Sequence, residues 1–150
     1  MVKEGQKAPA FALPDESGFD VALSDFAGKR IVLYFYPRDM TPGCTIEACS
    51  FRDYHAKFKE RGAVILGVST DGQRSHAKFK EAHGLPFALL SDKSASVCRK
   101  YGVWKKKKFM GKEYMGIERT TFVIDEAGKI SKIFKRVQPL GHWKEILALL

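Results

Sequence analysis

The sequence predicts an α/β fold in which a central mixed β-sheet is flanked by helices. Two strongly apolar runs, Ile31–Tyr36 and Ala63–Ser69, have the length and the β-branched and aromatic content of buried strands. Helical patterns follow both runs, as in sheets that are covered on both faces. Towards the C-terminus, Thr120–Ile124 and Lys129–Phe134 flank a turn sequence and predict a hairpin within the same sheet.

The N-terminal part predicts short elements. Phe11–Leu13 and Phe19–Leu23 flank an Asp-Glu-Ser-Gly turn, so we expect an N-terminal β-hairpin extension. Ser24–Gly28 predicts a single turn before the first buried strand. A long amphipathic helix then begins near Cys44 and ends before Gly62, a residue typical of helix C-termini. Three aromatic residues share one face of this helix: Phe51, Tyr54 and Phe58.

The second half alternates helices and strands. The segment Ser75–His83 predicts a helix that Gly84 ends, Phe87–Leu90 a short strand, and Ser94–Tyr101 a third helix. The last residues predict a docked helix, whose apolar face comprises Trp143, Ile146, Leu147 and Leu150. We expect the histidines His76, His83 and His142 at the surface or at helix ends.

Composition narrows the function classes. A chain of 150 residues with no internal repeat or linker predicts one domain over residues 1–150. No apolar run approaches bilayer-spanning length and no signal sequence is apparent, so we expect a cytoplasmic protein without membrane contact. The net charge of +9 raises nucleic acid as a partner, with Lys105–Lys108 as the candidate patch. Because no nucleic-acid-binding motif accompanies this run, we interpret it as a solvated lysine loop.

The strongest chemical signal is Cys44, which lies between a buried strand and the start of a helix. Free backbone N–H groups and the helix dipole at such a position favour a thiolate, so Cys44 is a candidate nucleophile. Pro42 and Gly43 tighten the preceding turn, and Thr41 can cap the helix and offer a hydroxyl to the site. The sequence therefore indicates redox chemistry on sulfur.

Two further residues belong with this site. Glu47 lies one helical turn beyond Cys44. A carboxylate beside a thiolate is repulsive, so we expect a compensating cation. Arg119 is the candidate that we favour, and Arg38 competes with it by proximity in sequence.

Cys49 follows Cys44 by five residues. On an ideal helix this spacing corresponds to a rise of about 7.5 Å and a Cα–Cα distance of roughly 8–9 Å, which exceeds the ~7 Å limit for a disulfide. A Cys44–Cys49 bond therefore requires the first turns of the helix to unwind. The polar residues that follow Cys49 favour such local opening.

These motifs resemble those of the peroxiredoxins. Residues 37–44 match the pattern of Pro, three residues, Thr, two residues, Cys, and residues 45–49 resemble the peroxiredoxin Q group, also called bacterioferritin comigratory protein. Further similarity extends over essentially the whole chain, including Tyr101–Trp104 and Gly116–Phe122. The resemblance implies a thioredoxin-like fold, which agrees with the predicted order of elements.

The resemblance also implies a function. The chain would be a thiol-dependent peroxidase that reduces hydrogen peroxide and organic hydroperoxides, with Cys44 as the attacking thiol and Cys49 as the resolving cysteine. Thr41 would hold the peroxide, Pro42 would shield the thiolate, Arg119 would polarise the substrate, and Glu47 would orient Arg119. A thioredoxin-type or glutaredoxin-type dithiol would reduce the disulfide. A monomer without cofactor or metal would suffice.

Magnitudes indicate how these residues act. An ordinary thiol is a few per cent ionised at pH 7, so complete ionisation accelerates attack by at most about 30-fold. A donor aimed at the charge that develops on the leaving oxygen can supply about 10²–10³-fold. We therefore expect Thr41 and Arg119 to act chiefly on the transition state.

Alternative interpretations remain open at this point. Cys98 is interpreted as structural, although some relatives place the resolving cysteine on another helix. A metal site formed by Cys44, Cys49 and His55 lacks the usual Cys-x-x-Cys spacing. The same lack weakens the thiol-disulfide oxidoreductase alternative. A basic redox-sensing or chaperone-like binding module is the non-enzymatic alternative, and peroxide-dependent turnover distinguishes it from an enzyme.

Overall fold

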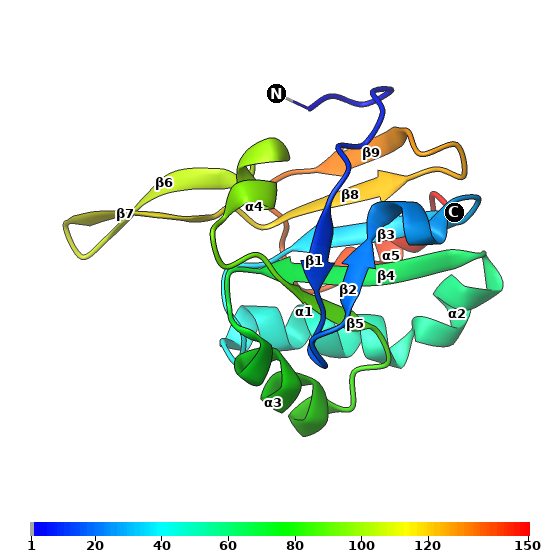
Figure 1. Cartoon of the computed structure of the whole chain (residues 1–150). Coiled ribbons are helices and arrows are strands. Elements are labelled where there is room, and N and C mark those ends of the chain that lie inside the picture. Colours follow the sequence, from blue (N-terminus) through cyan, green and yellow to red (C-terminus); the bar gives the residue numbers. More distant parts are fainter. Residues whose placement is uncertain (1) are drawn as a thin grey trace.

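The structure is a computed structural model that describes residues 2–150. Its centre is a five-stranded sheet with the order β5-β4-β3-β8-β9 (Figure 1). Its strands are β3 (Arg30–Phe35), β4 (Ala63–Ser69), β5 (Ala88–Ser91), β8 (Thr120–Ile124) and β9 (Ile130–Phe134). β3, β4 and β5 run parallel, and β8 and β9 pair antiparallel. The predicted mixed sheet is confirmed.

Helices cover one face of the sheet: α1 (Pro42–Asp53), α2 (His55–Glu60), α3 (Gln73–His83) and α5 (His142–Leu147). The opposite face is covered by the predicted N-terminal hairpin, β1 (Ala12–Pro14) with β2 (Asp20–Ala22), and by the short helix α4 (Ser96–Lys100). A 3₁₀ turn, η1 (Leu23–Phe26), follows the hairpin as predicted. Among residues 2–150, every helix falls short of the length and apolarity needed to cross a bilayer.

The sheet separates two cores because successive side chains of a strand point to opposite faces. On β3, Leu33 and Phe35 join the core beneath the N-terminal hairpin and α4, whereas Val32 and Tyr34 join the core beneath α1, α3 and α5. Both faces of β3 are therefore buried, which explains its nearly continuous apolar sequence. The chain leaves the C-terminal end of this central strand and turns into α1 (Figure 1).

The predicted long helix is interrupted at Tyr54, and this part of the prediction was wrong. Tyr54 has φ −108° and ψ 14°, so α1 ends there and α2 starts at the next residue. Its ring stacks on that of Trp143 in α5, with centroids 3.5 Å apart and an interplanar angle of 10°. Phe51 and Phe58 remain fully buried on either side of the break. Tertiary packing therefore overrides a helical periodicity that continues through the break.

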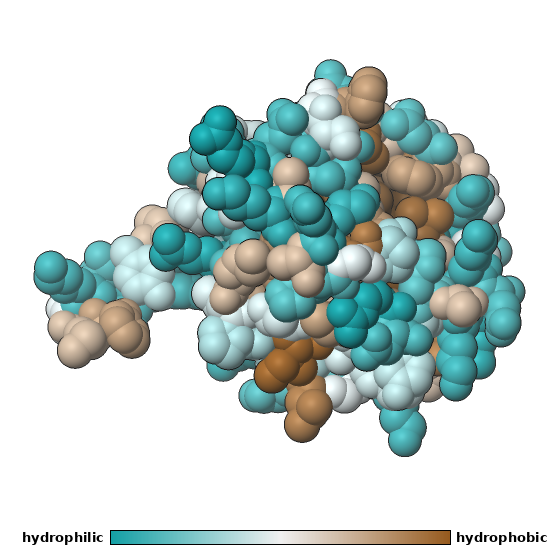
Figure 2. Space-filling view, turned by 90° about the horizontal axis from the view of Figure 1, so that it is seen from below, coloured by the Kyte–Doolittle hydropathy of each residue, from teal (hydrophilic) through white to brown (hydrophobic). Residues whose placement is uncertain are grey.

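The lysine run is a strand and not a loop, which corrects a second prediction. β6 (Trp104–Phe109) pairs antiparallel with β7 (Lys112–Ile117) and forms an arm that projects from the body (Figures 1 and 2). Met110 and Gly111 join the strands with positive φ angles of 50° and 80°, as a type I′ hairpin turn requires. Apolar side chains gather near the tip: Phe109, Met110, Tyr114 and Met115 are exposed.

The remaining elements agree with the predictions within two or three residues. α3 begins two residues before the predicted helix, and Gly84 ends it in the left-handed conformation with φ 58°. β5 begins and ends one residue later than predicted. α4 begins two residues later and ends one residue earlier than predicted. The prediction that the histidines lie at the surface or at helix ends was wrong for His76, which is buried inside α3, whereas His83 and His142 lie at helix ends, His142 being buried as well. His76 and His142 each form hydrogen bonds through both ring nitrogens, which compensates for the loss of water.

Candidate active site

Cys44 is the third residue of α1, directly after the turn that follows β3. Its side chain is buried, and it lies in the first helical turn, where backbone N–H groups have no partner within the helix. Residues 42–53 form this helix without a break, and the positive end of its dipole favours negative charge within the first turn, where Cys44 lies. The predicted position of the thiol at a strand-to-helix turn is confirmed.

Arg119 is the cation beside the thiol. Its Nη2 donates to Cys44 Sγ at 3.3 Å, and its Nη1 donates to Glu47 Oε1 at 2.7 Å. Arg119 lies between β7 and β8, 75 positions from Cys44 in sequence. The competing candidate, Arg38, has an exposed side chain. Burial alone lowers the pKa of Arg119, but the charges of Glu47 and Cys44 outweigh it and raise this pKa, which keeps the guanidinium charged.

Glu47 is buried beneath Arg119, with a side chain only 1% exposed. Burial raises the pKa of this carboxyl from 4.5 to about 7, although the Arg119 charge acts in the opposite direction. Among residues 2–150, nothing bonds to the second carboxyl oxygen, Oε2, or to the buried hydroxyl of Tyr34. The site therefore holds a carboxyl that ionises near neutral pH.

Gly43 lets the guanidinium approach the start of α1 closely. A Cβ atom at this position would lie 3.1 Å from Arg119 Nη2 and 3.4 Å from Cγ of Pro139. The 3.1 Å contact would be too short unless the guanidinium moved away from the helix by a few tenths of an ångström. Close packing against Arg119 thus favours glycine at position 43, in addition to the tight turn that the sequence predicted.

Thr41 occupies the N-cap position of α1, but its side chain does not cap the helix. The hydroxyl instead donates to the backbone carbonyl of Arg38 at 2.9 Å, which closes the turn before the helix. The predicted side-chain cap was therefore wrong, because the hydroxyl donates within the turn and does not accept from an N–H of the helix. Pro42 is the first helical residue, where its missing N–H costs nothing, and its ring is exposed.

The other two cysteines lie in different environments. Cys49 is half-buried on α1 and is a free thiol, as are Cys44 and Cys98. Cys98 is fully buried on α4, in the core on the opposite face of the sheet from Cys44. Its backbone N–H donates to Asp92 Oδ2 at 2.7 Å, and burial raises the pKa of its thiol well above the ordinary value. The sheet therefore separates Cys98 from Cys44.

Sequence reasoning missed Lys107, which belongs to β6 and lies within electrostatic range of the site. Burial and the Arg119 charge lower the pKa of Lys107, whereas Cys44 and Glu118 act to raise it. The aliphatic part of its side chain packs over Gly116 of β7. The turn at Met110–Gly111 was the signal that could have predicted a strand here.

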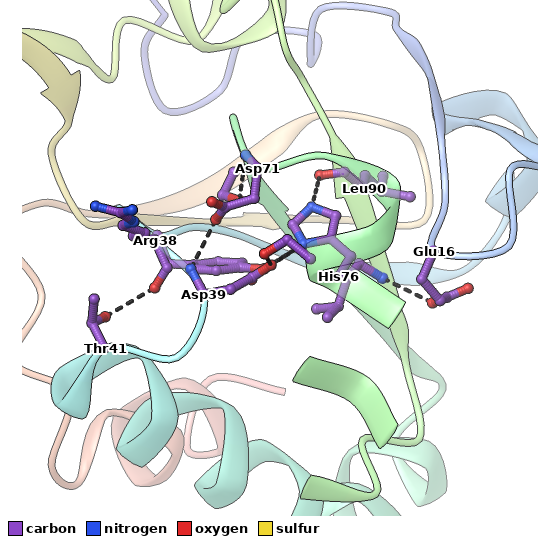
Figure 3. A network of polar contacts seen from close by, with 11 residues as sticks. Glu16, Arg38, Asp39, Thr41, Asp71, His76 and Leu90 are labelled. Atoms are coloured by element: carbon purple, nitrogen blue, oxygen red, sulfur yellow. Dashed lines mark hydrogen bonds and ion pairs between the residues drawn. The ribbon is translucent and has the colours of Figure 1, made fainter. Parts of the chain in front are cut away.

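A buried polar network, also missed, lies beside the turn before α1 (Figure 3). Asp39, Asp71 and His76 bring potential metal-ligand atoms within 4.8 Å of one another. Hydrogen bonds occupy these atoms: Asp39 accepts from Tyr36 and Ser75, and Asp71 accepts from the backbone N–H of Asp39. We therefore interpret the cluster as a hydrogen-bond network that holds the turn.

Comparison with known sequences gives a consistent result. The chain matches the AhpC/TSA family over residues 4–133. It is 54% identical over 149 residues to Peroxiredoxin Bcp of Bacillus subtilis, an alignment that covers 99% of this chain and 95% of that protein. It is 46% identical over 146 residues to Peroxiredoxin Bcp of Escherichia coli K12, covering 97% of this chain and 94% of that protein.

Solved structures give the same result. The bacterioferritin comigratory protein of Xanthomonas campestris, described for its alkyl peroxide reduction activity, superimposes with a TM-score of 0.91 and 36% identity, covering 98% of this chain and 96% of that one. Peroxidoxin BcpB of Mycobacterium tuberculosis superimposes with a TM-score of 0.88 and 40% identity, covering 99% and 96%. The thioredoxin-like fold that the sequence predicted is thereby confirmed.

Proposed function

Since the chain belongs to the peroxiredoxin Q, or Bcp, group of the AhpC/TSA family and is a thiol peroxidase, we propose that Cys44 is the residue that attacks the peroxide. The observation that carries this assignment is the contact between Cys44 Sγ and Arg119 Nη2 at 3.3 Å. Arg119 is itself oriented by Glu47. The Cys44 sulfur and a fixed double donor thus meet at the start of a helix.

The first step is a displacement at oxygen. The Cys44 thiolate attacks the terminal peroxide oxygen, an S–O bond forms as the O–O bond breaks, and the products are a sulfenic acid and water or an alcohol. Negative charge moves from sulfur to the leaving oxygen, which takes up a proton. Arg119 can donate to both atoms, and the Thr41 hydroxyl and Pro42 complete the peroxide site. These two residues lie in the turn immediately before α1.

The second step forms a disulfide between Cys44 and Cys49. The Cys49 thiol attacks the sulfenic sulfur, an S–S bond forms, and the hydroxyl leaves as water. On intact α1 the two Cα atoms are separated by roughly 8–9 Å, so the first turns must unwind before the bond forms. A thioredoxin-type or glutaredoxin-type dithiol then reduces the disulfide by exchange.

Apolar side chains around the start of α1 favour organic hydroperoxides in addition to hydrogen peroxide. Met40 and Ile46, which flank the first turn, have exposed fractions of 53% and 45%. Leu140 is 83% exposed and follows Pro139, the residue beside Gly43. The alkyl peroxide reduction described for the Xanthomonas protein agrees with such a surface.

Resolution within one chain also bears on assembly and location. A disulfide between Cys44 and Cys49 needs no residue from a second subunit, so a monomer can complete the cycle. The cycle does need a supply of reduced dithiol. Because thiols are kept reduced in the cytoplasm, we propose that the protein acts there.

The test is intact mass and peptide mapping after one equivalent of hydrogen peroxide. The wild-type protein should lose the mass of two hydrogen atoms, mapped to Cys44 and Cys49. Cys44→Ser should not react, and Cys49→Ser should stop at the sulfenic or sulfinic acid. Cys98→Ser, the matched control, should behave as the wild type. A selective reaction at any cysteine other than Cys44 would refute the assignment.

A further inference from the structure

We propose that His76 is a positioning residue for the peroxidase reaction. As a buried imidazolium it fixes Asp39, and through Asp39 it fixes the turn that presents Thr41 to Cys44. The inference rests on the proposed function, because it assigns a task to residues that support the same site. None of the steps above uses His76 or Asp39.

The charge of His76 follows from its hydrogen-bond partners (Figure 3). Nε2 lies 3.0 Å from the backbone carbonyl oxygen of Leu90, which only accepts, so Nε2 carries a hydrogen. Nδ1 lies 2.7 Å from Asp39 Oδ2. Asp39 also accepts from Tyr36 at 2.6 Å and from Ser75 at 2.8 Å. These two hydroxyl donors favour the ionised form of the Asp39 carboxyl, so its 2.7 Å contact with Nδ1 requires a hydrogen on Nδ1 as well.

The pair is shielded from water. The side chains of His76 and Asp39 are 0% and 2% exposed. Removal of either partner from such a pair leaves a buried charge without compensation, so each strongly fixes the position of the other. His76 belongs to α3, whereas Asp39 belongs to the turn between β3 and α1. The pair therefore ties the turn before Cys44 to a separate helix.

The turn needs such a restraint. Met40, between Asp39 and Thr41, has φ +64°, a left-handed conformation that a non-glycine residue adopts at an energetic cost. On one side, the Asp39 N–H donates to Asp71 Oδ2 at 2.8 Å. On the other, the Thr41 hydroxyl donates to the Arg38 carbonyl. Strained backbone persists only where its surroundings fix it, and the network supplies this fixation.

The restraint affects the two chemical steps differently. Attack on the peroxide requires Thr41 and Pro42 in place, so a displaced turn slows this step. Disulfide formation requires α1 to unwind, and a fixed turn does not assist it. Loss of the His76–Asp39 pair should therefore slow Cys44 oxidation without slowing the reaction with Cys49. A general loss of stability would not separate the steps in this way.

The experiment measures both rates by stopped-flow tryptophan fluorescence and rapid-quench mass spectrometry. The oxidation rate is taken in a Cys49→Ser background, where the sulfenic acid persists, and the disulfide rate in the parent protein. His76→Phe keeps a ring but loses both donors. We expect about 10- to 100-fold slower oxidation, the order of loss for a misplaced reactive geometry, and an unchanged or faster disulfide step. Asp39→Asn can still bond to a neutral His76, and its loss should be smaller.

Phe79→Leu is the matched control, because Phe79 is fully buried on α3 and its ring packs against that of Tyr36, with centroids 6.3 Å apart. Urea unfolding measures how far each variant is destabilised. Equal slowing of oxidation in Phe79→Leu at equal destabilisation would overturn the proposal, as would equal slowing of both steps in His76→Phe. Unchanged oxidation in His76→Phe would overturn it as well.

A measurement on the wild type keeps the proposal testable even if the variants do not fold. Nitrogen-15 NMR of the His76 ring at pH 7 should find hydrogens on both nitrogens. An unprotonated Nδ1 would overturn the proposal. A wild-type protein that does not reduce peroxide would refute the proposed function instead, and the NMR result would still decide the charge of His76.

Discussion

Replacing Glu47 by glutamine should make the free energy of unfolding less dependent on pH. The Glu47 carboxyl is 1% exposed, and burial raises its pKa from 4.5 to about 7 despite the neighbouring Arg119. An acid whose pKa is higher in the folded state resists ionisation there. Ionisation of the unfolded chain begins near pH 4.5, so stability falls as pH rises from that value through about 7, and is constant above it.

The magnitude follows from the two pKa values. The interval from 4.5 to about 7 corresponds to roughly 3 kcal/mol of stability lost at high pH. Part of this loss has already occurred at pH 5, so the change between pH 5 and pH 8 is about 2–3 kcal/mol. Glutamine does not titrate, and its carbonyl oxygen can still accept from Arg119. Therefore only the pH-dependent part of the stability difference between Glu47→Gln and the wild type reports on the ionisation of Glu47.

The assay is urea unfolding of the wild type and Glu47→Gln at several values between pH 5 and pH 8. The stability of Glu47→Gln relative to the wild type should increase by about 2–3 kcal/mol over this range. Glu81→Gln, at an exposed position of α3, is the matched control and should follow the wild type. Parallel curves for the wild type and Glu47→Gln would refute the reasoning, because they would mean that Glu47 ionises alike in both states.

Three further predictions concern the site and its supports. Arg119→Lys keeps the charge but loses one of two directed donors, so kcat/KM for peroxide should fall about 10²–10³-fold. Arg136→Lys, at a largely exposed position, is the control and should leave kcat/KM unchanged. Cys98→Ala should leave steady-state peroxidase activity within about twofold of wild type, because the sheet separates it from Cys44. Gly67→Ala should destabilise the protein by about 1–3 kcal/mol in urea unfolding, because its Cβ would lie 3.0 Å from the Tyr34 ring and hydroxyl; unchanged stability would contradict this packing.

Much of the fold could be predicted because local patterns and tertiary structure agree. The apolar runs around β3 and β4 form buried strands, and Gly84 ends α3 in the conformation that favours glycine. The cysteine motif also has a local basis, since a strand, a turn and a helix start are all encoded within a few residues. Its resemblance to peroxiredoxins indicated the family that the comparisons confirm.

The predictions from the sequence were wrong where contacts between residues distant along the chain determine the local structure. The break at Tyr54 depends on a stack with Trp143, which is 89 positions away by residue number. The lysine run forms a strand because β7 pairs with it. Four consecutive lysines lack the alternation of apolar and polar residues that predicts a strand from sequence. His76 has the sequence context of a surface residue, but the packing of α3 against the turn at Asp39 buries it.

The sequence by itself determined the family, the sheet of alternating strands and helices, and the position of Cys44 at a helix start. These properties depend on short-range spacing, which the chain carries without reference to its fold. Only the tertiary structure decided that Arg119, and not the nearer Arg38, lies beside the thiol, and that Glu47 is buried with it. Contacts of this kind depend on how β8 is placed against α1, and the burial that sets the pKa of Glu47 exists only after the chain has folded.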